Sequence, residues 1–203
     1  MTPPATDVLA ALKAENAQRL LAALPEGDDE PRFCYRWLLL DSLAHELNML
    51  RGALGEPDVV HHARLGRTDC EISLGFGSIE VHLSWVHLPG IAHCKQEVPF
   101  YALDKRVTLT LPSPYLRAMP SLLTIEGGDD NSPHSWTTNE TLSYEEAFKR
   151  ELIEFESAIR DGRDPRTDIV DGLHDIALCH AIATSHITSQ PVTMPSALPA
   201  WAH

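Results

Sequence analysis

The segment that decides the fold is residues 36–55, which read RWLLLDSLAHELNMLRGALG. Leucines recur along it every three or four residues, the spacing that places side chains on one side of an α-helix. They are Leu39, Leu43, Leu47, Leu50 and Leu54. Gly55, followed by Pro57, is a typical helix end. The pattern predicts a helix over 36–55 whose leucine stripe faces the core.

The opposite side of this helix carries Asp41, His45 and Asn48. At about 100° per residue, these three side chains lie within about 60° of one another. An aspartate one turn before a histidine can accept a hydrogen bond from one ring nitrogen and leave the other nitrogen to exchange a proton with a substrate hydroxyl. The spacing fits an acid–base pair, and it fits equally an ordinary solvated helix face, because Asp and His at this spacing are common.

Downstream of this helix, the spacing of the apolar residues changes to the two-residue period of β-strands. Apolar and polar residues alternate over 79–85 and again over 107–111, as in half-buried strands. Two short segments, 75–78 and 103–105, have the composition of hairpin turns. We therefore expect an α+β fold with a largely antiparallel open β-sheet over 59–126. The polar stretch 127–141, rich in Gly, Asp and Asn, indicates an exposed loop.

Further helices are expected on both sides of this sheet. An Ala- and Leu-rich pattern covers 7–24, before a Pro- and Gly-containing breaker at 25–31. Ser143 with Glu146 three residues later has the pattern of a capping box. The helix after it carries apolar residues on one face, namely Phe148, Leu152, Phe155 and Ile159. A last helix is expected over 168–189.

These elements divide the chain into three parts. Residues 1–35 form an N-terminal helix and linker, residues 36–190 a single α+β domain, and residues 191–203 a proline-rich tail. A chain of this length buries roughly 70% of its unfolded surface, which suffices for one core. The three parts therefore predict one folded body with two appendages.

Composition narrows the classes of partner and compartment. The formal net charge of −13 repels phosphate backbones and anionic lipids, so nucleic acid and membrane are poor candidate partners. The four cysteines form no C-x-x-C pair, and no signal peptide or long apolar run is present. We expect a cytoplasmic protein.

Two other candidate sites fail on their spacing. His82, His87, His93 and Cys94 could suggest a metal, but an unbroken strand would place His82 and His87 on opposite faces, so we expect no metal site. Gly75-Phe76-Gly77 is not a dinucleotide fingerprint, because Glu80 stands where the third glycine belongs and a strand follows. This chain is therefore expected to bind no cofactor by itself.

Several segments together carry a family likeness. Residues 40–57, LDSLAHELNMLRGALGEP, resemble the D-x-x-x-H helix and following G-E-P turn of the Gfo/Idh/MocA oxidoreductases. Residues 143–152, SYEEAFKREL, and 158–165, AIRDGRDP, are similar to the closing helix pair of that family. Asp171-Gly172-Leu173 and then AIATS at 181–185 continue the match in order. The resemblance extends over about residues 35–192.

The resemblance implies the C-terminal domain of such an enzyme. In the family, an N-terminal Rossmann domain holds NAD or NADP and supplies a catalytic lysine from an E-K-P motif. The C-terminal domain, similar to that of glyceraldehyde-3-phosphate dehydrogenase, supplies an open sheet with helices on one face, the oligomer interface and the D-x-x-x-H helix. Carried over to this sequence, His45 is the acid–base group on a substrate hydroxyl, Asp41 orients it, and Asn48 contacts the substrate.

One half of the family pattern has no counterpart here. The first 35 residues lack G-x-G-x-x-G and are too few for a βαβ unit, and the E-K-P lysine is missing. Three hypotheses follow. In the first, the chain supplies Asp41 and His45 to a separate Rossmann-bearing polypeptide that binds NAD(P). In the second, the chain itself is a non-redox isomerase, lyase or cyclase that acts on a small hydroxylated substrate. In the third, the chain is a non-catalytic binding module. In each case we expect at least a homodimer formed through the sheet, and the helix over 7–24 as a cover for exposed surface.

Overall fold

In the computed structural model, which describes residues 6–91, 94–129 and 131–195, the leucine-rich segment lies within a longer helical run. The run begins with α2 (Asp29–Phe33), continues as a π-helix, η1 (Cys34–Leu43), and ends with α3 (Ala44–Leu54). It starts earlier than predicted because Pro31 falls in its first turn, where proline is tolerated. The predicted stripe is confirmed, since Leu39, Leu43, Leu47 and Leu50 are buried.

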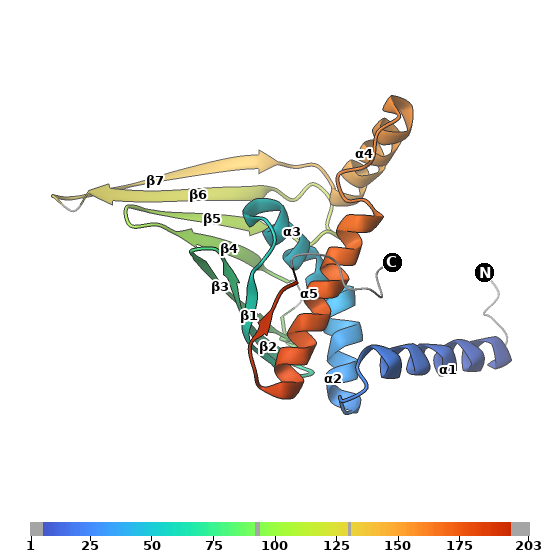
Figure 1. The fold of residues 1–203 in the computed structure, drawn as a ribbon. Coiled ribbons are helices and arrows are strands. Elements are labelled where there is room, and N and C mark those ends of the chain that lie inside the picture. The colour runs from blue at the N-terminus through green and yellow to red at the C-terminus, as the bar shows by residue number, and fades with distance from the viewer. Residues whose placement is uncertain (1–5, 92–93, 130, 196–203) are drawn as a thin grey trace. The chain divides into compact units, whose positions relative to one another are not determined.

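The chain divides into two compact units, which Figure 1 draws with their elements labelled. Unit 1 consists of residues 1–88 and 167–203, and unit 2 of residues 89–166. The expectation of a single α+β domain over residues 36–190 stays a prediction.

Unit 1 contains the hydrophobic core. Its four-stranded sheet has the order β3-β2-β1-β8 and is antiparallel throughout. The strands are β1 (Val59–Leu65), β2 (Asp69–Phe76), β3 (Ile79–Val86) and β8 (Val192–Thr193). The helical run and α5 (Ile169–Thr188) pack on one face of this sheet (Figure 1). Fully buried side chains come from both layers, among them Leu39, Leu47, Val60, Leu74, Leu178 and Ile182.

The first helix, α1 (Thr6–Ala23), agrees with the prediction within one residue at each end. It meets the core only near its C-terminal end, where Leu20, Ala23 and Leu24 pack. Val8, Leu9 and Leu12, nearer its start, are 48%, 41% and 49% exposed. The helix therefore contacts the core near its C-terminal end, and a role as a cover for exposed surface stays a prediction.

Unit 2 is an open antiparallel sheet, β4-β5-β6-β7, followed by one helix. The strands are β4 (Gln96–Tyr101), β5 (Lys105–Leu111), β6 (Ser121–Asp129) and β7 (Ser132–Ser143), and the helix is α4 (Ala147–Asp161). Paired residues share a face, so the register separates an apolar face from a polar one. Val98, Leu109 and Leu123 lie on the apolar face, and the Arg106–Glu126 ion pair lies on the other.

Two local predictions are wrong. Residues 127–141 are not a loop, because β6 continues to Asp129 and β7 pairs with it along its length. The Thr-rich part of β7, with Trp136, favours a strand more strongly than the neighbouring Gly, Asp and Asn oppose it. The capping box does not form: Ser143 still belongs to β7, its hydroxyl accepts a hydrogen bond from the Glu145 amide at 3.0 Å, and α4 starts at Ala147.

The predicted tail is partly ordered, because Val192 and Thr193 pair with β1. Its remainder, residues 196–203, lies outside the described residues. The last helix agrees with its prediction: Asp168 caps it by accepting a hydrogen bond from the Asp171 amide at 2.8 Å. Taken together, the elements form the predicted α+β fold with open antiparallel β-structure, but the described strands divide into two four-stranded sheets and not the one sheet expected over 59–126.

Candidate functional site

The predicted acid–base pair lies at the junction between η1 and α3. Asp41 is in the π-helix and His45 in the α-helix, and both residues are exposed. A π-helix closes its hydrogen bonds over five residues instead of four, so the angle of about 100° per residue does not apply up to Leu43. Within the described residues, no hydrogen bond or ion pair joins Asp41 to His45. His45 and Asn48 both belong to α3, and Asp41 lies in η1, about one turn before His45.

Asn48 contacts the neighbouring helix. Its side-chain Nδ2 donates hydrogen bonds to Asp171 Oδ2 at 2.7 Å and to Asp175 Oδ2 at 2.9 Å. The two aspartates are one turn apart on α5, so both face α3. The two N–H groups of the amide are thereby engaged within the fold.

Arg51, one turn beyond Asn48, forms the centre of this cluster. Its side chain is 4% exposed. Its Nη2 lies 2.7 Å from Glu56 Oε1 and 3.0 Å from Asp171 Oδ1, and its Nη1 pairs with Asp175 and donates to the Asp171 carbonyl. One guanidinium therefore ties the end of α3 to the turn after it and to the first two turns of α5. We call Asn48, Arg51, Glu56, Asp171 and Asp175 the Arg51 cluster.

Contacts within the Arg51 cluster shift the pKa values of Arg51 and Glu56. Burial by itself lowers the pKa of Arg51, but hydrogen bonds with Glu56 and Asp175 outweigh it and hold that pKa above its ordinary value. The hydrogen bond from Arg51 is the main reason that the pKa of Glu56 lies below its ordinary value of 4.5. Arg51 and Glu56 are therefore both charged at neutral pH.

Sequence reasoning missed the Arg51 cluster, although some of its members lie in the segments quoted for the family resemblance. Asp171 and Asp175 have helical i,i+4 spacing, and Arg51 falls on the core side of its helix next to Leu47 and Leu50. An arginine at an apolar position is a usable signal, because a buried charge requires an opposite charge close by. Its partners on α5 could not be identified, since they are more than a hundred residues away in sequence.

Three histidines of α5 contact other residues of unit 1. His180 Nε2 lies 3.0 Å from the Ala23 carbonyl, and its ring meets Tyr35 edge-on. His186 Nδ1 accepts a hydrogen bond from the Leu65 amide at 3.4 Å, and burial lowers the pKa of His186. His174 lies beside the Arg51 cluster, with Nδ1 3.6 Å from Glu56 Oε2.

The residues that could suggest a metal do not converge. His82 lies on β3, and His87 follows the end of that strand, while His93 lies outside the described residues. Over the described ranges, no group of three or more His, Cys, Asp or Glu side chains is arranged to hold a metal ion.

The described residues also do not fit a nicotinamide dinucleotide. A dinucleotide needs a glycine-rich turn between a parallel strand and a helix, where backbone amides receive the pyrophosphate. Gly75 and Gly77 belong instead to a hairpin between antiparallel strands β2 and β3, with Gly77 at φ 60°. The described chain before β1 is helical, so no Rossmann βαβ unit is formed there.

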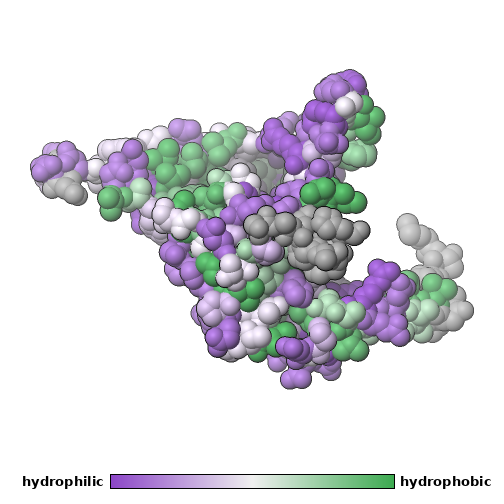
Figure 2. Space-filling model, viewed as in Figure 1, coloured by the Kyte–Doolittle hydropathy of each residue, from purple (hydrophilic) through white to green (hydrophobic). Residues whose placement is uncertain are grey.

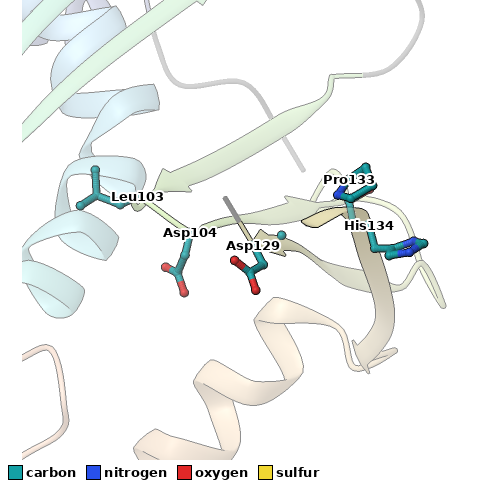
Figure 3. A pocket seen from close by; sticks show the side chains of 7 residues that line it. Leu103, Asp104, Asp129, Pro133 and His134 are labelled. Atoms are coloured by element: carbon teal, nitrogen blue, oxygen red, sulfur yellow. The ribbon is translucent and has the colours of Figure 1, made fainter. Parts of the chain in front are cut away.

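A separate hollow of about 320 Å³ lies in unit 2 at the hairpin ends of the sheet. Figure 3 shows Asp104 and Asp129 on its wall, with their carboxylates directed to the same side. The other lining residues are Leu103, Gly128, Pro133, His134 and Ser135. None of the predicted site residues lines it. Its carboxylates are exposed and form no enclosed ligand site.

Compared by sequence, the chain matches no protein-family model and no curated protein. Its structure is similar to solved oxidoreductases. A proposed NADPH-dependent oxidoreductase from Desulfitobacterium hafniense matches with a TM-score of 0.62 at 16% identity over 76% of this chain and 47% of that one. An oxidoreductase from Agrobacterium radiobacter, solved with NAD+, L-tartaric acid and magnesium, matches with a TM-score of 0.58 at 17% identity over 76% and 48%.

A third similar structure is UDP-N-acetylglucosamine 3-dehydrogenase from Acidithiobacillus ferrooxidans, with a TM-score of 0.57 at 16% identity over 74% of this chain and 49% of that enzyme. The chain thus spans about half the length of each of these proteins. This partial match agrees with the resemblance to the Gfo/Idh/MocA oxidoreductases. The chain has the fold of the C-terminal half of such an oxidoreductase.

Proposed function

We propose that this chain supplies an acid–base half-site that a separate nucleotide-binding polypeptide completes. The observation that carries the proposal is the match to about half of each oxidoreductase, together with the absence of any nucleotide-binding turn in the described residues. In such a pairing the NAD(P)-binding surface belongs to the partner. This chain contributes His45, Asp41 and Asn48.

The chemistry assigned to the chain is proton transfer. One ring nitrogen of His45 takes the proton of a substrate hydroxyl while Asp41 accepts a hydrogen bond from the other nitrogen and orients the ring. Both side chains are exposed at the η1–α3 junction, so a substrate and a second domain can reach them. The missing hydrogen bond between them would form when a substrate and the partner exclude water, since catalytic hydrogen bonds are often incomplete in free enzymes.

The Arg51 cluster supports this assignment by fixing the helix that bears His45. Arg51 and Asn48 bind α3 to α5 through five hydrogen bonds to Asp171 and Asp175. A general base acts efficiently only when its position is held within a fraction of an ångström. His45 lies three residues before Asn48, on the part of α3 that this cluster anchors.

The proposal includes a small hydroxylated substrate, such as a sugar or polyol, a cytoplasmic setting and a homo-oligomer. The buried free thiols of Cys34, Cys70 and Cys179 fit a reducing compartment. The half-exposed apolar face of the unit 2 sheet, which includes Val98, Leu109 and Leu123, fits a subunit contact. No helix in the described parts of the chain is long and apolar enough to cross a membrane.

A second candidate function is a non-catalytic binding module. The exposure of both Asp41 and His45, and the use of the Asn48 amide N–H groups within the fold, favour it. It predicts that His45→Ala changes neither turnover nor ligand affinity. A non-redox enzyme would instead act on a polyol without nicotinamide and lose that activity on the same substitution.

The experiment compares the chain alone with the chain mixed with NAD+-binding proteins of the same cell, purified on immobilised NAD+. Each sample receives NAD+ and a panel of sugars and polyols, and NADH formation is followed. We expect NADH only in a mixture and none from either component. NADH from the chain alone, or none from any mixture, would contradict the half-site proposal.

A further inference from the structure

Helix α4 presents an apolar stripe that the described structure leaves exposed. Phe148, Leu152, Phe155 and Ile159 are 52%, 69%, 59% and 67% exposed. Figure 2 shows apolar side chains gathered along one side of this helix. Phe148 meets the ring of Tyr115, with centroids 5.9 Å apart, which covers only one end of the stripe. A stripe of this size on an otherwise acidic surface indicates an interaction site.

The spacing of the stripe is that of a two-helix interface. The four residues follow one another at intervals of four, three and four, which is the d-a-d-a pattern of a heptad repeat. Along one edge of the stripe runs a groove of about 440 Å³, lined by Glu146, Phe148, Lys149, Leu152, Ile153 and Glu156. Lys149 and Glu156 occupy the two e positions and therefore flank the apolar seam.

We propose that α4 pairs in antiparallel orientation with α4 of a second copy of this chain. An antiparallel pair places Phe148 against Ile159 of the second copy and Leu152 against its Phe155. By the two-fold symmetry, each of these layers occurs twice. All four apolar residues contribute to the interface, and every layer packs a phenylalanine against an aliphatic side chain.

The charges beside the seam select this occupant and this orientation. In an antiparallel pair the e positions of the two helices meet, so Lys149 of each copy faces Glu156 of the other. A parallel pair would instead bring Glu151, at a g position, against Glu156 of the second copy, which is repulsive. A chain with a formal net charge of −13 repels its own copies, so self-association requires such local opposite charges.

The ion pairs within α4 do not prevent Lys149 of one copy from pairing with Glu156 of the other. Lys149 lies 3.4 Å from Glu145, and Glu156 lies 3.2 Å from Arg160. All four side chains are more than half exposed, so these pairs are weak and readily shared. The pairing uses no residue of the His45 site and is independent of the proposed chemistry.

The test is a charge-reversal cycle in the full chain. Dimerisation is measured by sedimentation equilibrium from about 1 µM to about 1 mM, the range of weak protein pairs. We expect a dimer whose Kd rises about tenfold or more in Lys149→Glu and in Glu156→Lys, because each places like charges together twice. The double variant, which restores opposite charges, should return to the wild-type Kd.

Arg150→Glu is the matched control, because position 150 lies on the side of α4 away from the stripe. It makes the same change of charge and should leave the Kd unchanged. A monomer throughout the concentration range would overturn the proposal. A dimer whose Kd is unchanged by both single reversals would also overturn it, because the contact would then lie on another surface. The same holds if the Kd of the double variant does not return to the wild-type value.

Discussion

Arg51 is the residue on which the packing of α3 against α5 depends. Its side chain is 4% exposed and compensates three carboxylates, of which Asp175 is the most buried at 16% exposed. Removing the guanidinium would leave these carboxylates together without a cation. A buried ion pair broken on one side costs far more than the pair itself contributes.

We therefore predict that Arg51→Met lowers the free energy of unfolding by about 3 kcal/mol, as measured by urea denaturation. Arg64→Met serves as the control, since Arg64 also pairs with two carboxylates, Asp69 and Glu71, but its side chain is 45% exposed. Its loss should leave the unfolding curve nearly unchanged. Equal effects of the two substitutions would show that burial of the Arg51 cluster is unimportant.

Glu56 makes the contribution of the Arg51 cluster to stability depend on pH. The hydrogen bond from Arg51 lowers the folded-state pKa of Glu56 below 4.5, so the folded chain binds fewer protons at this site than the unfolded chain. Its contribution to stability is complete above pH 4.5 and is lost as the pH falls through the folded-state pKa. We predict that wild type exceeds Glu56→Gln in stability by a constant amount at neutral pH and that the difference shrinks below pH 4.5. A difference that grows on acidification would contradict this.

At the scale of elements, the contact between β6 and β7 depends on a glycine. A Cβ atom on Gly127 would stand 2.3 Å from Cζ2 of Trp136, whose ring therefore lies over the glycine. At Gly128 the nearest atom is a backbone oxygen 3.9 Å away. The two adjacent positions thus differ in the space above them.

We predict that Gly127→Ala destabilises the chain by about 1–2 kcal/mol through overpacking, or displaces the Trp136 ring from the sheet. Gly128→Ala should leave both stability and the ring position unchanged. Thermal unfolding and the NMR shifts of the Trp136 indole would report the two effects. A neutral Gly127→Ala with unshifted indole signals would show that the ring does not lie on Gly127.

Helices and strands were predicted correctly where apolar residues recurred with one clear period. The alternation over 79–85 and the α5 pattern each predicted an element near its observed bounds. The leucine stripe predicted the end of its helical run but not its start at Asp29. The π-helix could not be predicted, because ten residues contain too few turns for its period to be told from that of an α-helix. Strand β7 was missed because Gly128, Asp129 and Asn131, which form its turn, dominated the composition of the window around its threonines.

At the scale of the whole molecule, the fold was predictable and the completed site was not. The order of the matching segments predicted the C-terminal half of an oxidoreductase, and the structural similarity agrees. The engagement of Asn48 depends on α5, which helical spacing within 36–55 does not reveal. The site that we propose would be shared between two polypeptides and complete in neither.

The central claim is that His45 transfers a proton for a reaction completed by a nucleotide-binding partner. The most direct measurement is kcat for NADH formation in an active mixture, with wild type, His45→Ala and, as a matched exposed histidine on β1, His62→Ala. We predict that His45→Ala lowers kcat by about a hundredfold or more, the contribution of a general base, and that His62→Ala does not change it. Equal kcat values for wild type and His45→Ala would contradict the claim.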